Sequence, residues 1–535
     1  MSRHQIIIAI VTLFGVCGKA LATAPCEGLA SLQLPNTTIT LTQTVSAGAF
    51  VPPPGPLGPP GVPPPDFKAL PAFCRVAASV KPTKDSDIRI EVWMPMEGWS
   101  GRLLSVGNGG FAGAISYGEM IQALHAGNAT ASTDTGHIAP SNPMDGSWAI
   151  GHPEKVVDFG YRGIHEMTRL AKATAKAFYG GEPRYSYFES CSNGGRQALM
   201  EAQRFPEDYN GILAGAPANY WTRVGIWAIA MKPALDRGGY IPAAKLATVA
   251  RAVNAACDAQ DGVSDGIVDD PRTCHFKPAT LLCQARDSDK CLTAPQVAVL
   301  EQLYAGAHDA KGRAIYPGYL PGGEEGPAGW GLWIMGAAPG QSLIFGFERG
   351  FFAGMVSEKA DWDFKDVEVD AAVNAAEAKT AKILNATDPN LTAFKSKGGK
   401  LILYHGWNDP ALPALNTIEY YDNVVSRMGT RATAEFTRLY MVPGMQHCGG
   451  GPGPANFGES GPTEPPDPQH NIGLALQQWV EKGVPPSSII ATRYPQGALK
   501  QSLKMTRPLC PYPQRAVWTG TGSTDDAANF ACKAR

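Results

Sequence analysis

Apolar residues along this chain recur with two different spacings, and stretches of the two kinds alternate. Strands are predicted by short apolar or alternating runs at 88–95, 102–110, 185–190, 209–217, 398–409 and 435–448. Helices are predicted where apolar positions recur every three or four residues, at 163–180, 195–206 and 471–483. Strands that alternate with helices indicate an α/β fold with a mainly parallel sheet.

The stretch from about residue 221 to residue 397 breaks this alternation. It contains many loops, few clear strands and four of the cysteines. We therefore expect a lid domain at 221–397, inserted between two parts of one core at 25–220 and 398–535. A proline- and glycine-rich tract at 50–67 predicts an extended surface loop.

The first 24 residues have the pattern of a signal peptide. Positive charge in residues 1–5, an apolar run at 6–16 and Ala-Thr-Ala at 22–24 fit a leader with a cleavage site. The alternative is an uncleaved anchor. No later apolar run reaches the roughly 18–20 residues that a membrane span needs. This pattern predicts a secreted or periplasmic protein.

The cysteines also favour export. Cleavage would remove Cys17 and leave ten cysteines, and an even number in an exported chain favours disulfides. Their spacing does not fit a zinc site. Local matching suggests the pairs Cys26–Cys74, Cys257–Cys274, Cys283–Cys291 and Cys510–Cys532, which leaves Cys191 and Cys448. The sequence alone does not determine connectivity, so this pairing is a hypothesis.

Charge argues against two classes of partner. The formal net charge is −2 and the basic residues do not cluster. We therefore expect neither a nucleic-acid partner nor binding to an anionic membrane surface. The oligomeric state is not indicated by the sequence.

Ser192 is the first candidate for chemistry. It lies where a predicted strand meets a predicted helix, with the small residues Ser190 and Gly194 two positions before and after it. A nucleophilic serine occupies such a turn in G-x-S-x-G motifs, and the helix N-terminus beside it favours an oxyanion. The alternative is an ordinary turn that caps a helix.

A nucleophilic serine of this kind is followed in the chain by an acid and then by a histidine. Asp409 and His447 occur in that order, each in a loop after a predicted strand. His405 precedes Asp409, so its order is wrong. A disulfide between Cys191 and Cys448 would hold the serine and histidine loops together, whereas the alternative is that either cysteine is a small buried thiol.

Three motifs in order, Cys-Ser-Asn-Gly-Gly, Gly-Trp-Asn-Asp and Pro-Gly-Met-Gln-His-Cys, resemble those of the tannase/feruloyl esterase family of α/β-hydrolases. The resemblance covers essentially the whole mature chain. It implies Ser192, Asp409 and His447 as the catalytic triad and Cys191–Cys448 as its bridging disulfide, and it supports the four local pairings. Ser190 departs from the glycine of the wider α/β-hydrolase motif.

The resemblance also assigns two further groups of residues. It implies oxyanion amides from Asn193 and from Gly110, in the glycine-rich run at 105–113. It further implies a structural Ca²⁺ site in the aspartate-rich loop at 257–271. The expected ligands are the side chains of Asp258, Asp261 and Asp265 and the carbonyls of Val263 and Ile267. A solvated acidic turn is the alternative.

These features together predict a secreted serine carboxylesterase that cleaves esters of aromatic (phenolic) acids such as feruloyl or galloyl esters. The family also includes hydrolases of terephthalate monoesters, so that activity stays open. So do a serine peptidase on the same fold and a non-catalytic wall- or glycan-binding protein. Aromatic residues of the expected lid suit a planar substrate, although each one singly is better explained as lid core: Trp330, Trp333, Phe345, Phe347, Phe351 and Phe352.

Overall fold

A computed structural model describes residues 25–53, 66–139, 142–459, 463, 465–494 and 505–534. The predicted signal peptide and most of the proline-rich tract lie outside these residues. Within the described part of the chain, no helix is long and apolar enough to cross a membrane.

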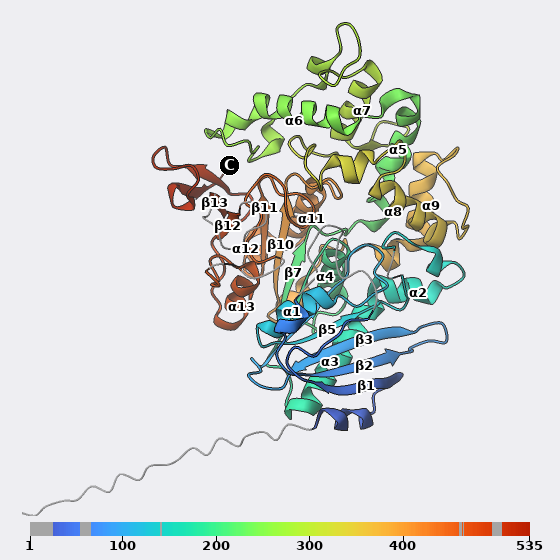
Figure 1. Cartoon of the computed structure of the whole chain (residues 1–535), viewed down its shortest axis with the longest axis vertical. Helices are drawn as coiled ribbons and strands as arrows, with labels where there is room; N and C mark the ends of the chain where they lie inside the picture. Colours follow the sequence, from blue (N-terminus) through green and yellow to red (C-terminus); the bar gives the residue numbers. More distant parts are fainter. Residues whose placement is uncertain are drawn as a thin grey trace, which may run out of the picture.

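A nine-stranded sheet forms the centre of the molecule (Figure 1). Its order is β1-β2-β3-β5-β4-β6-β7-β10-β11. The strands β1 to β3 and the pair β3–β5 run antiparallel, whereas all pairs from β5 to β11 run parallel. The bounds are β1 (Thr37–Val45), β2 (Phe73–Val80), β3 (Ile88–Pro95), β4 (Arg102–Val106), β5 (Ala129–Thr133), β6 (Tyr185–Cys191), β7 (Gly211–Gly215), β10 (Lys400–Gly406) and β11 (Thr437–Val442). The predicted α/β fold with a mainly parallel sheet is confirmed.

Helices cover both faces of this sheet, which explains the apolar runs in its central strands. In β10, Leu401 and Leu403 belong to the same buried cluster as residues of α3, α4 and α11, whereas Ile402 and Tyr404 pack with α1 and α13. Successive side chains of a strand point to opposite faces of the sheet, so the side chains on both faces of β10 must be apolar. The helices are α1 (Tyr117–His125), α3 (Gly163–Tyr179), α4 (Asn193–Arg204), α11 (Ala414–Met428) and α13 (Ile472–Lys482).

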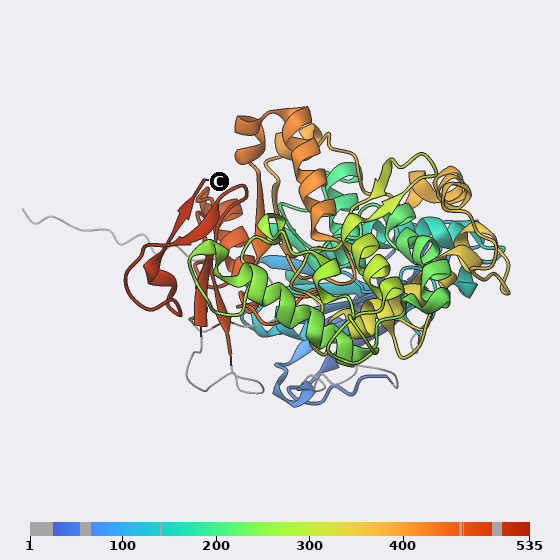
Figure 2. The same cartoon turned by 90° about the horizontal axis from the view of Figure 1, so that it is seen from above.

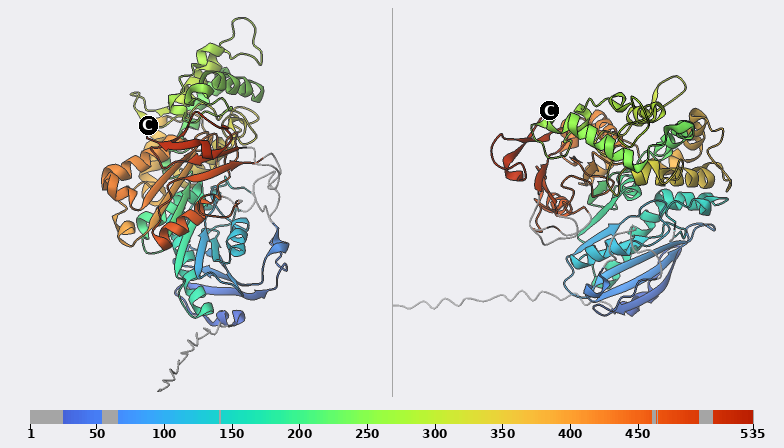
Figure 3. Two further views of the ribbon diagram at one scale, coloured as in Figure 1. Left: turned by 90° about the vertical axis from the view of Figure 1, so that its left-hand side faces the viewer. Right: turned by 45° about the horizontal axis from the view of Figure 1, so that its top comes forward.

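A long insertion separates β7 from β10, although these strands are neighbours in the sheet. Figures 1, 2 and 3 show its helices, coloured green to yellow, gathered over one end of the sheet. Many of its apolar side chains, including Trp227, Leu300 and Phe352, form one cluster with core residues such as Phe159 and Leu412. Its elements are α5 (Ile226–Ala234), α6 (Ala243–Cys257), α7 (Ala294–Ala305), β8 (Ala307–His308), β9 (Ala314–Tyr316), α8 (Leu343–Phe351), α9 (Val369–Leu384) and α10 (Thr392–Ser396). The domain limits at 221 and 397 stay a prediction.

Smaller elements complete the core. The short helices α2 (Pro153–Val157) and α12 (Thr430–Ala434) lie before α3 and β11. After α13, the chain forms two antiparallel ribbons that the sequence pattern does not indicate: β12 (Ile489–Arg493) with β13 (Met505–Leu509), and β14 (Arg515–Trp518) with β15 (Phe530–Lys533).

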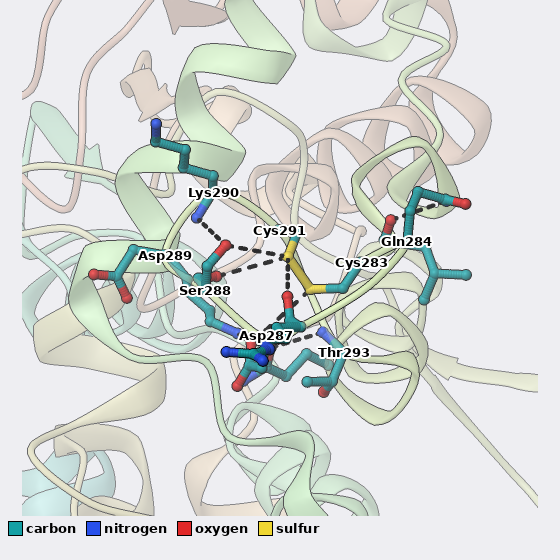
Figure 4. The surroundings of a disulfide bond; sticks show 12 residues. Cys283, Gln284, Asp287, Ser288, Asp289, Lys290, Cys291 and Thr293 are labelled. Carbon is teal, nitrogen blue, oxygen red and sulfur yellow. Dashed lines mark hydrogen bonds and ion pairs between the residues drawn. A yellow bond between two sulfur atoms is a disulfide. The ribbon is translucent and has the colours of Figure 1, made fainter.

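Five disulfides join the ten cysteines of the described residues, in the pairs Cys26–Cys74, Cys191–Cys448, Cys257–Cys274, Cys283–Cys291 and Cys510–Cys532. All the pairings expected from the sequence are therefore present. Cys283 and Cys291 lie close to Asp287 (Figure 4). Their sulfurs are bonded to each other, so this group does not form a thiolate metal site.

Candidate active site

The local backbone around Ser192 is a tight turn between β6 and α4. Ser192 has φ 66° and ψ −124°, a conformation that costs a non-glycine residue free energy and must be held by its surroundings. Its N–H donates to the carbonyl of Gly215 at 2.9 Å, and its carbonyl accepts from the N–H of Ala218 at 3.1 Å. The turn therefore fixes the serine at the end of the sheet, in front of the helix N-terminus.

Ser190 fits this turn because its neighbours are glycines. A Cβ atom at Gly194 would lie 1.9 Å from the Ser190 hydroxyl oxygen, and one at Gly107 would lie 2.9 Å from it. The missing side chains leave the room that Ser190 occupies. The departure from a glycine at this position therefore leaves the strand–turn–helix geometry intact.

The structure brings Ser192, His447 and Asp409 together from distant parts of the chain. The Nε2 atom of His447 lies 2.9 Å from the Ser192 Oγ, and its Nδ1 lies 2.8 Å from the Asp409 Oδ2. Asp409 follows β10 and His447 follows β11, which are adjacent parallel strands. This chain of hydrogen bonds can remove a proton from the serine hydroxyl as it attacks a carbonyl carbon.

Asp409 is buried and fully hydrogen-bonded. Its Oδ1 accepts the N–H groups of Ala411 at 2.8 Å and Leu412 at 2.9 Å, and its Oδ2 also lies 3.1 Å from the His405 Nε2. Burial alone would raise the pKa of Asp409, but the charge of His447 and hydrogen bonds from both histidines hold it well below its usual range. The Asp409 carboxylate is therefore ionised at neutral pH, and it can stabilise a protonated His447.

His405, which its order in the chain excludes as the base, lies behind the carboxylate instead. Its side chain is buried, and its Nδ1 lies 2.7 Å from the Thr417 hydroxyl. It contacts the carboxylate without reaching Ser192, so it is a positioning residue. Sequence reasoning did not assign this role; its position four residues before Asp409, at the end of β10, is the signal that could have suggested it.

The loops that carry Asp409 and His447 are tied to other segments. The Cys191–Cys448 disulfide links the residue before the serine to the residue after the histidine, with 5.9 Å between the Cα atoms. The Gln446 side chain donates to the carbonyl of Glu325 at 2.8 Å, and the Asn408 side chain donates to the carbonyl of Gly322. The insertion therefore contacts both loops directly.

The two residues expected to supply oxyanion amides line the same cavity as the serine. Gly110 and Asn193 line it together with Ser192, and neither N–H group has a hydrogen-bond partner among the described residues. Gly110 has φ +54°, and a Cβ atom there would lie 2.7 Å from the Pro143 carbonyl oxygen, so the loop requires glycine. These N–H groups are available for a developing oxyanion.

Arg196 supports this corner, and sequence reasoning did not single it out. It is fully buried, and its Nε donates to the Asn193 side chain at 2.8 Å. Its other nitrogens donate to the carbonyls of Gly160 at 2.8 Å and Phe159 at 3.1 Å. Burial lowers the pKa of Arg196 to about 9. An arginine in the first turn after the serine is the signal that could have indicated it.

The cavity in front of Ser192 is mainly apolar, with five phenylalanine and tryptophan side chains among its lining residues. Three of the expected lid aromatics line it: Trp333, Phe347 and Phe351. Trp333 also contacts His447 edge-on, with 4.9 Å between the ring centroids. The other three lie in the core of the insertion: Trp330, Phe345 and Phe352. Such a lining is chemically suited to a planar apolar ring.

The aspartate-rich loop forms a second, smaller cavity away from the serine. Its lining includes Asp261, Val263, Asp265 and Ile267 of the expected calcium ligands. Asp258 does not line it: its Oδ1 instead accepts the backbone N–H groups of Asp265 at 3.2 Å and Gly266 at 3.0 Å.

Two other ionisable residues face this loop cavity. Asp269, which the sequence did not single out, lines it, and Arg507 forms an ion pair with Asp265. Burial, then the nearby carboxylate of Asp261, raises the pKa of Asp269 to about 7. Three aspartates therefore line this small cavity, and Arg507 is the single basic residue among the described residues that line it.

A mainly parallel sheet with the serine on a strand–helix turn and the acid and histidine after later strands defines the α/β-hydrolase class. The family model described as tannase and feruloyl esterase matches residues 74–533, and the chain belongs to this family. It is accordingly a carboxylic ester hydrolase of the feruloyl esterase and tannase type.

Relatives and solved structures that are similar to this chain are also named as esterases. An uncharacterised esterase of Xanthomonas campestris pv. campestris is 41% identical over 96% of this chain and 92% of that protein. A probable feruloyl esterase B-2 of Aspergillus terreus is 33% identical over 86% of each chain. The crystal structure of feruloyl esterase B from Aspergillus oryzae superimposes with a TM-score of 0.85 and 29% identity over 95% of this chain and 99% of that chain.

Proposed function

We propose that this protein is an exported serine esterase that hydrolyses esters of phenolic acids, such as feruloyl or galloyl esters, through Ser192, His447 and Asp409. The observation that carries the proposal is the hydrogen-bonded Ser192–His447–Asp409 chain at the wall of an aromatic cavity. The relatives named feruloyl esterase support a phenolic acid as the acyl group of the substrate.

The geometry suggests a two-step mechanism. The Ser192 Oγ attacks the ester carbonyl carbon while His447 Nε2 takes its proton, and the N–H groups of Asn193 and Gly110 bind the oxyanion. Collapse of this intermediate breaks the ester C–O bond, and His447 returns the proton to the leaving alcohol. Water then repeats the sequence on the acyl-enzyme, releasing the acid and restoring Ser192. Asp409 stabilises the histidinium in both steps.

One experiment separates this function from a peptidase and from a non-catalytic binding protein. A fluorophosphonate probe should label Ser192, located by peptide mapping, and kcat/KM should be measured on methyl ferulate, methyl gallate, a terephthalate monoester and a peptide amide. We expect labelling and turnover of the phenolic esters. Cleavage of the peptide alone would favour the peptidase, and absence of labelling and turnover would favour the non-catalytic binding protein.

We also propose that the insertion is a lid that supplies most substrate contacts and that its aspartate-rich loop holds a structural Ca²⁺ ion. The side chains of Asp258, Asp261 and Asp265 and the carbonyls of Val263 and Ile267 would be its ligands. Calcium prefers six to eight oxygen ligands, and four of these residues already line one small cavity. The Cys257–Cys274 disulfide closes the loop.

Removal of calcium should destabilise the protein. Chelation with EDTA should lower Tm, and added Ca²⁺ should restore it, because a ligand bound only to the folded state stabilises that state. The measurement is differential scanning calorimetry. The variant Asp261→Asn should lose most of this response, whereas Asp289→Asn, an exposed aspartate of the same insertion, should keep it. A Tm that does not respond to either addition would reject the site.

The five disulfides support export to an oxidising compartment, whether extracellular or periplasmic. The proposed ligand is a small aromatic ester, with no nucleic acid or membrane as partner. The leader at 1–24 would direct this export; N-terminal sequencing of the mature protein tests the cleavage site.

The double variant Cys191→Ser with Cys448→Ser should lose more activity than structure. The disulfide holds the loop of His447 beside the turn of Ser192, and proton transfer needs this geometry within roughly 0.5 Å. The loss of unfolding free energy should be on the order of 2–5 kcal/mol, with the fold still standing at room temperature. Ester turnover and urea unfolding measure the two effects.

A matched control for this variant is Cys510→Ser with Cys532→Ser, which removes a disulfide of the C-terminal ribbons. We expect it to lower stability while kcat at room temperature stays near that of the parent protein. Equal loss of activity in the two double variants would contradict the role assigned to the Cys191–Cys448 disulfide.

A further inference from the structure

One acidic side chain lines the aromatic cavity, and the catalytic scheme does not use it. Glu348, on α8, faces the cavity that also contains Ser192 and His447. It is only 4% exposed, and its carboxyl group has no hydrogen bond or ion pair with any residue that the structure describes. A buried carboxyl group in this state is unfavourable for folding unless something else compensates it.

The space for this carboxyl group is provided by a glycine on a neighbouring element. A Cβ atom at Gly225 would lie 2.2 Å from the Glu348 Oε2. Gly225 itself lines the cavity. The segment before α5 and the helix α8 thus leave room for the head group of Glu348 at the cavity wall.

Burial gives this carboxyl group an unusual protonation state. It raises the pKa of Glu348 to about 8, with no neighbouring charge contributing. Near neutral pH the group is therefore mostly protonated and offers one O–H donor and one carbonyl acceptor. A phenolic hydroxyl also donates and accepts, so the two groups are complementary.

We infer that Glu348 is a specificity-determining residue that hydrogen-bonds a hydroxyl group on the aromatic ring of the acyl group. This inference rests on the proposed function and narrows its substrate class to esters whose ring carries a free hydroxyl. The other residues around the ring are mainly apolar, including Trp221, Phe347 and Phe351. Glu348 is then the lid group that distinguishes a hydroxylated ring from a methylated one.

The same arrangement disfavours an anionic ring. Among the described residues that line the cavity there is no lysine or arginine. A ring carboxylate, as in a terephthalate monoester, would be buried beside Glu348 without a cation, which is energetically costly. The structure therefore favours phenolic esters over terephthalate monoesters, a choice that the sequence left open.

The test compares four methyl esters that differ in the ring substituent: ferulate, 3,4-dimethoxycinnamate, cinnamate and 4-carboxycinnamate. We would measure kcat/KM for the parent protein, Glu348→Gln, Glu348→Leu and Glu301→Gln, an exposed glutamate on α7 that serves as the control. The parent protein should prefer ferulate over the dimethoxy ester by roughly 10–100-fold, the value of one or two buried hydrogen bonds. The 4-carboxy ester should be the poorest substrate.

The preference of each variant for ferulate should depend on whether the side chain at position 348 can form hydrogen bonds. Glu348→Leu should bring the ratio of kcat/KM on ferulate to kcat/KM on the dimethoxy ester close to 1, because the lost hydrogen bond serves only the hydroxylated ring. Glu348→Gln retains a donor and an acceptor, so it should keep most of the preference, and Glu301→Gln should keep all of it. A purely structural role for Glu348 would instead lower turnover of all four esters by the same factor.

Failure of this inference can be told from failure of the proposed function. If the parent protein hydrolyses 4-nitrophenyl acetate but neither the cinnamates nor methyl gallate, the proposed function is wrong. If it hydrolyses cinnamates without preferring the free hydroxyl, or if Glu348→Leu keeps that preference, only the role of Glu348 is overturned. The measurement on the parent protein needs no variant to fold, so the inference is tested in either case.

Discussion

Replacing Ser192 by alanine is expected to abolish ester hydrolysis, with a decrease in kcat of roughly 10⁴–10⁶. The variant loses the oxygen that forms the acyl-enzyme, so only slow attack by water, helped by the free amides of Asn193 and Gly110, remains. The Ser192 hydroxyl makes its hydrogen bond to His447 and none to the backbone that holds the turn. The protein should therefore fold with an unchanged Tm.

Steady-state turnover of methyl ferulate and a thermal melt measure these two quantities. Ser186→Ala, which changes a buried serine of the same strand β6, is the matched control and should keep the parent activity within a few-fold. If Ser192→Ala retains substantial turnover, the nucleophile lies elsewhere.

The second large effect is expected for Asp409→Asn, with a loss of roughly 10⁴ in kcat. Asparagine can still accept the N–H groups of Ala411 and Leu412 through one oxygen. Its amide nitrogen would then face His447 and His405, where the carboxylate now accepts. His447 would lose the anion that orients its ring and stabilises its charge, and an amide donor favours the wrong tautomer of the ring.

This prediction is checked by kcat on methyl ferulate, together with a melt that verifies folding. Asp422→Asn, an exposed aspartate on α11, is the control and should leave kcat unchanged. Near-parental activity of Asp409→Asn would require another carboxylate. Asp134, a buried aspartate that precedes Ser192 in the chain, is a poor substitute: its Oδ1 accepts the N–H groups of Arg89 and Gly136, and among the described residues it forms no hydrogen bond or ion pair with His447.

The departure at Ser190 shows how a local motif and its tertiary setting combine. The G-x-S-x-G motif has a glycine at this position, so the sequence alone suggests that a serine side chain would disturb the tight turn. In the structure the hydroxyl occupies space that Gly107 and Gly194 leave open. Gly194 is a neighbour in sequence, but Gly107 comes from the loop after β4 and becomes a neighbour only once the sheet has formed.

The sequence by itself determined several features that depend on local order: six of the nine strands of the central sheet, the helices α3, α4 and α13, the corner at Ser192, the succession of Asp409 and His447, the pairing hypothesis for the cysteines and the family resemblance. It did not indicate β1, β2, β5, α1 or α11. Periodicity of apolar residues and the placement of small residues at turns act over a few positions, so they can be read along the chain. The order of the acid and the histidine follows from the order of the strands that carry them.

Only the tertiary structure decided what surrounds these residues. The contact of the Asp409 carboxylate with His447, the bonds of Arg196 to the carbonyls of Phe159 and Gly160, the division of the aromatic residues of the insertion between cavity and core, and the unpaired carboxyl group of Glu348 depend on segments that are far apart in sequence. Burial and hydrogen-bond partners arise from such long-range packing, and they set both the protonation state and the direction of a side chain. The role of a residue such as Glu348, in an otherwise mainly apolar helix, therefore follows from the cavity that it lines and cannot be inferred from its sequence neighbours.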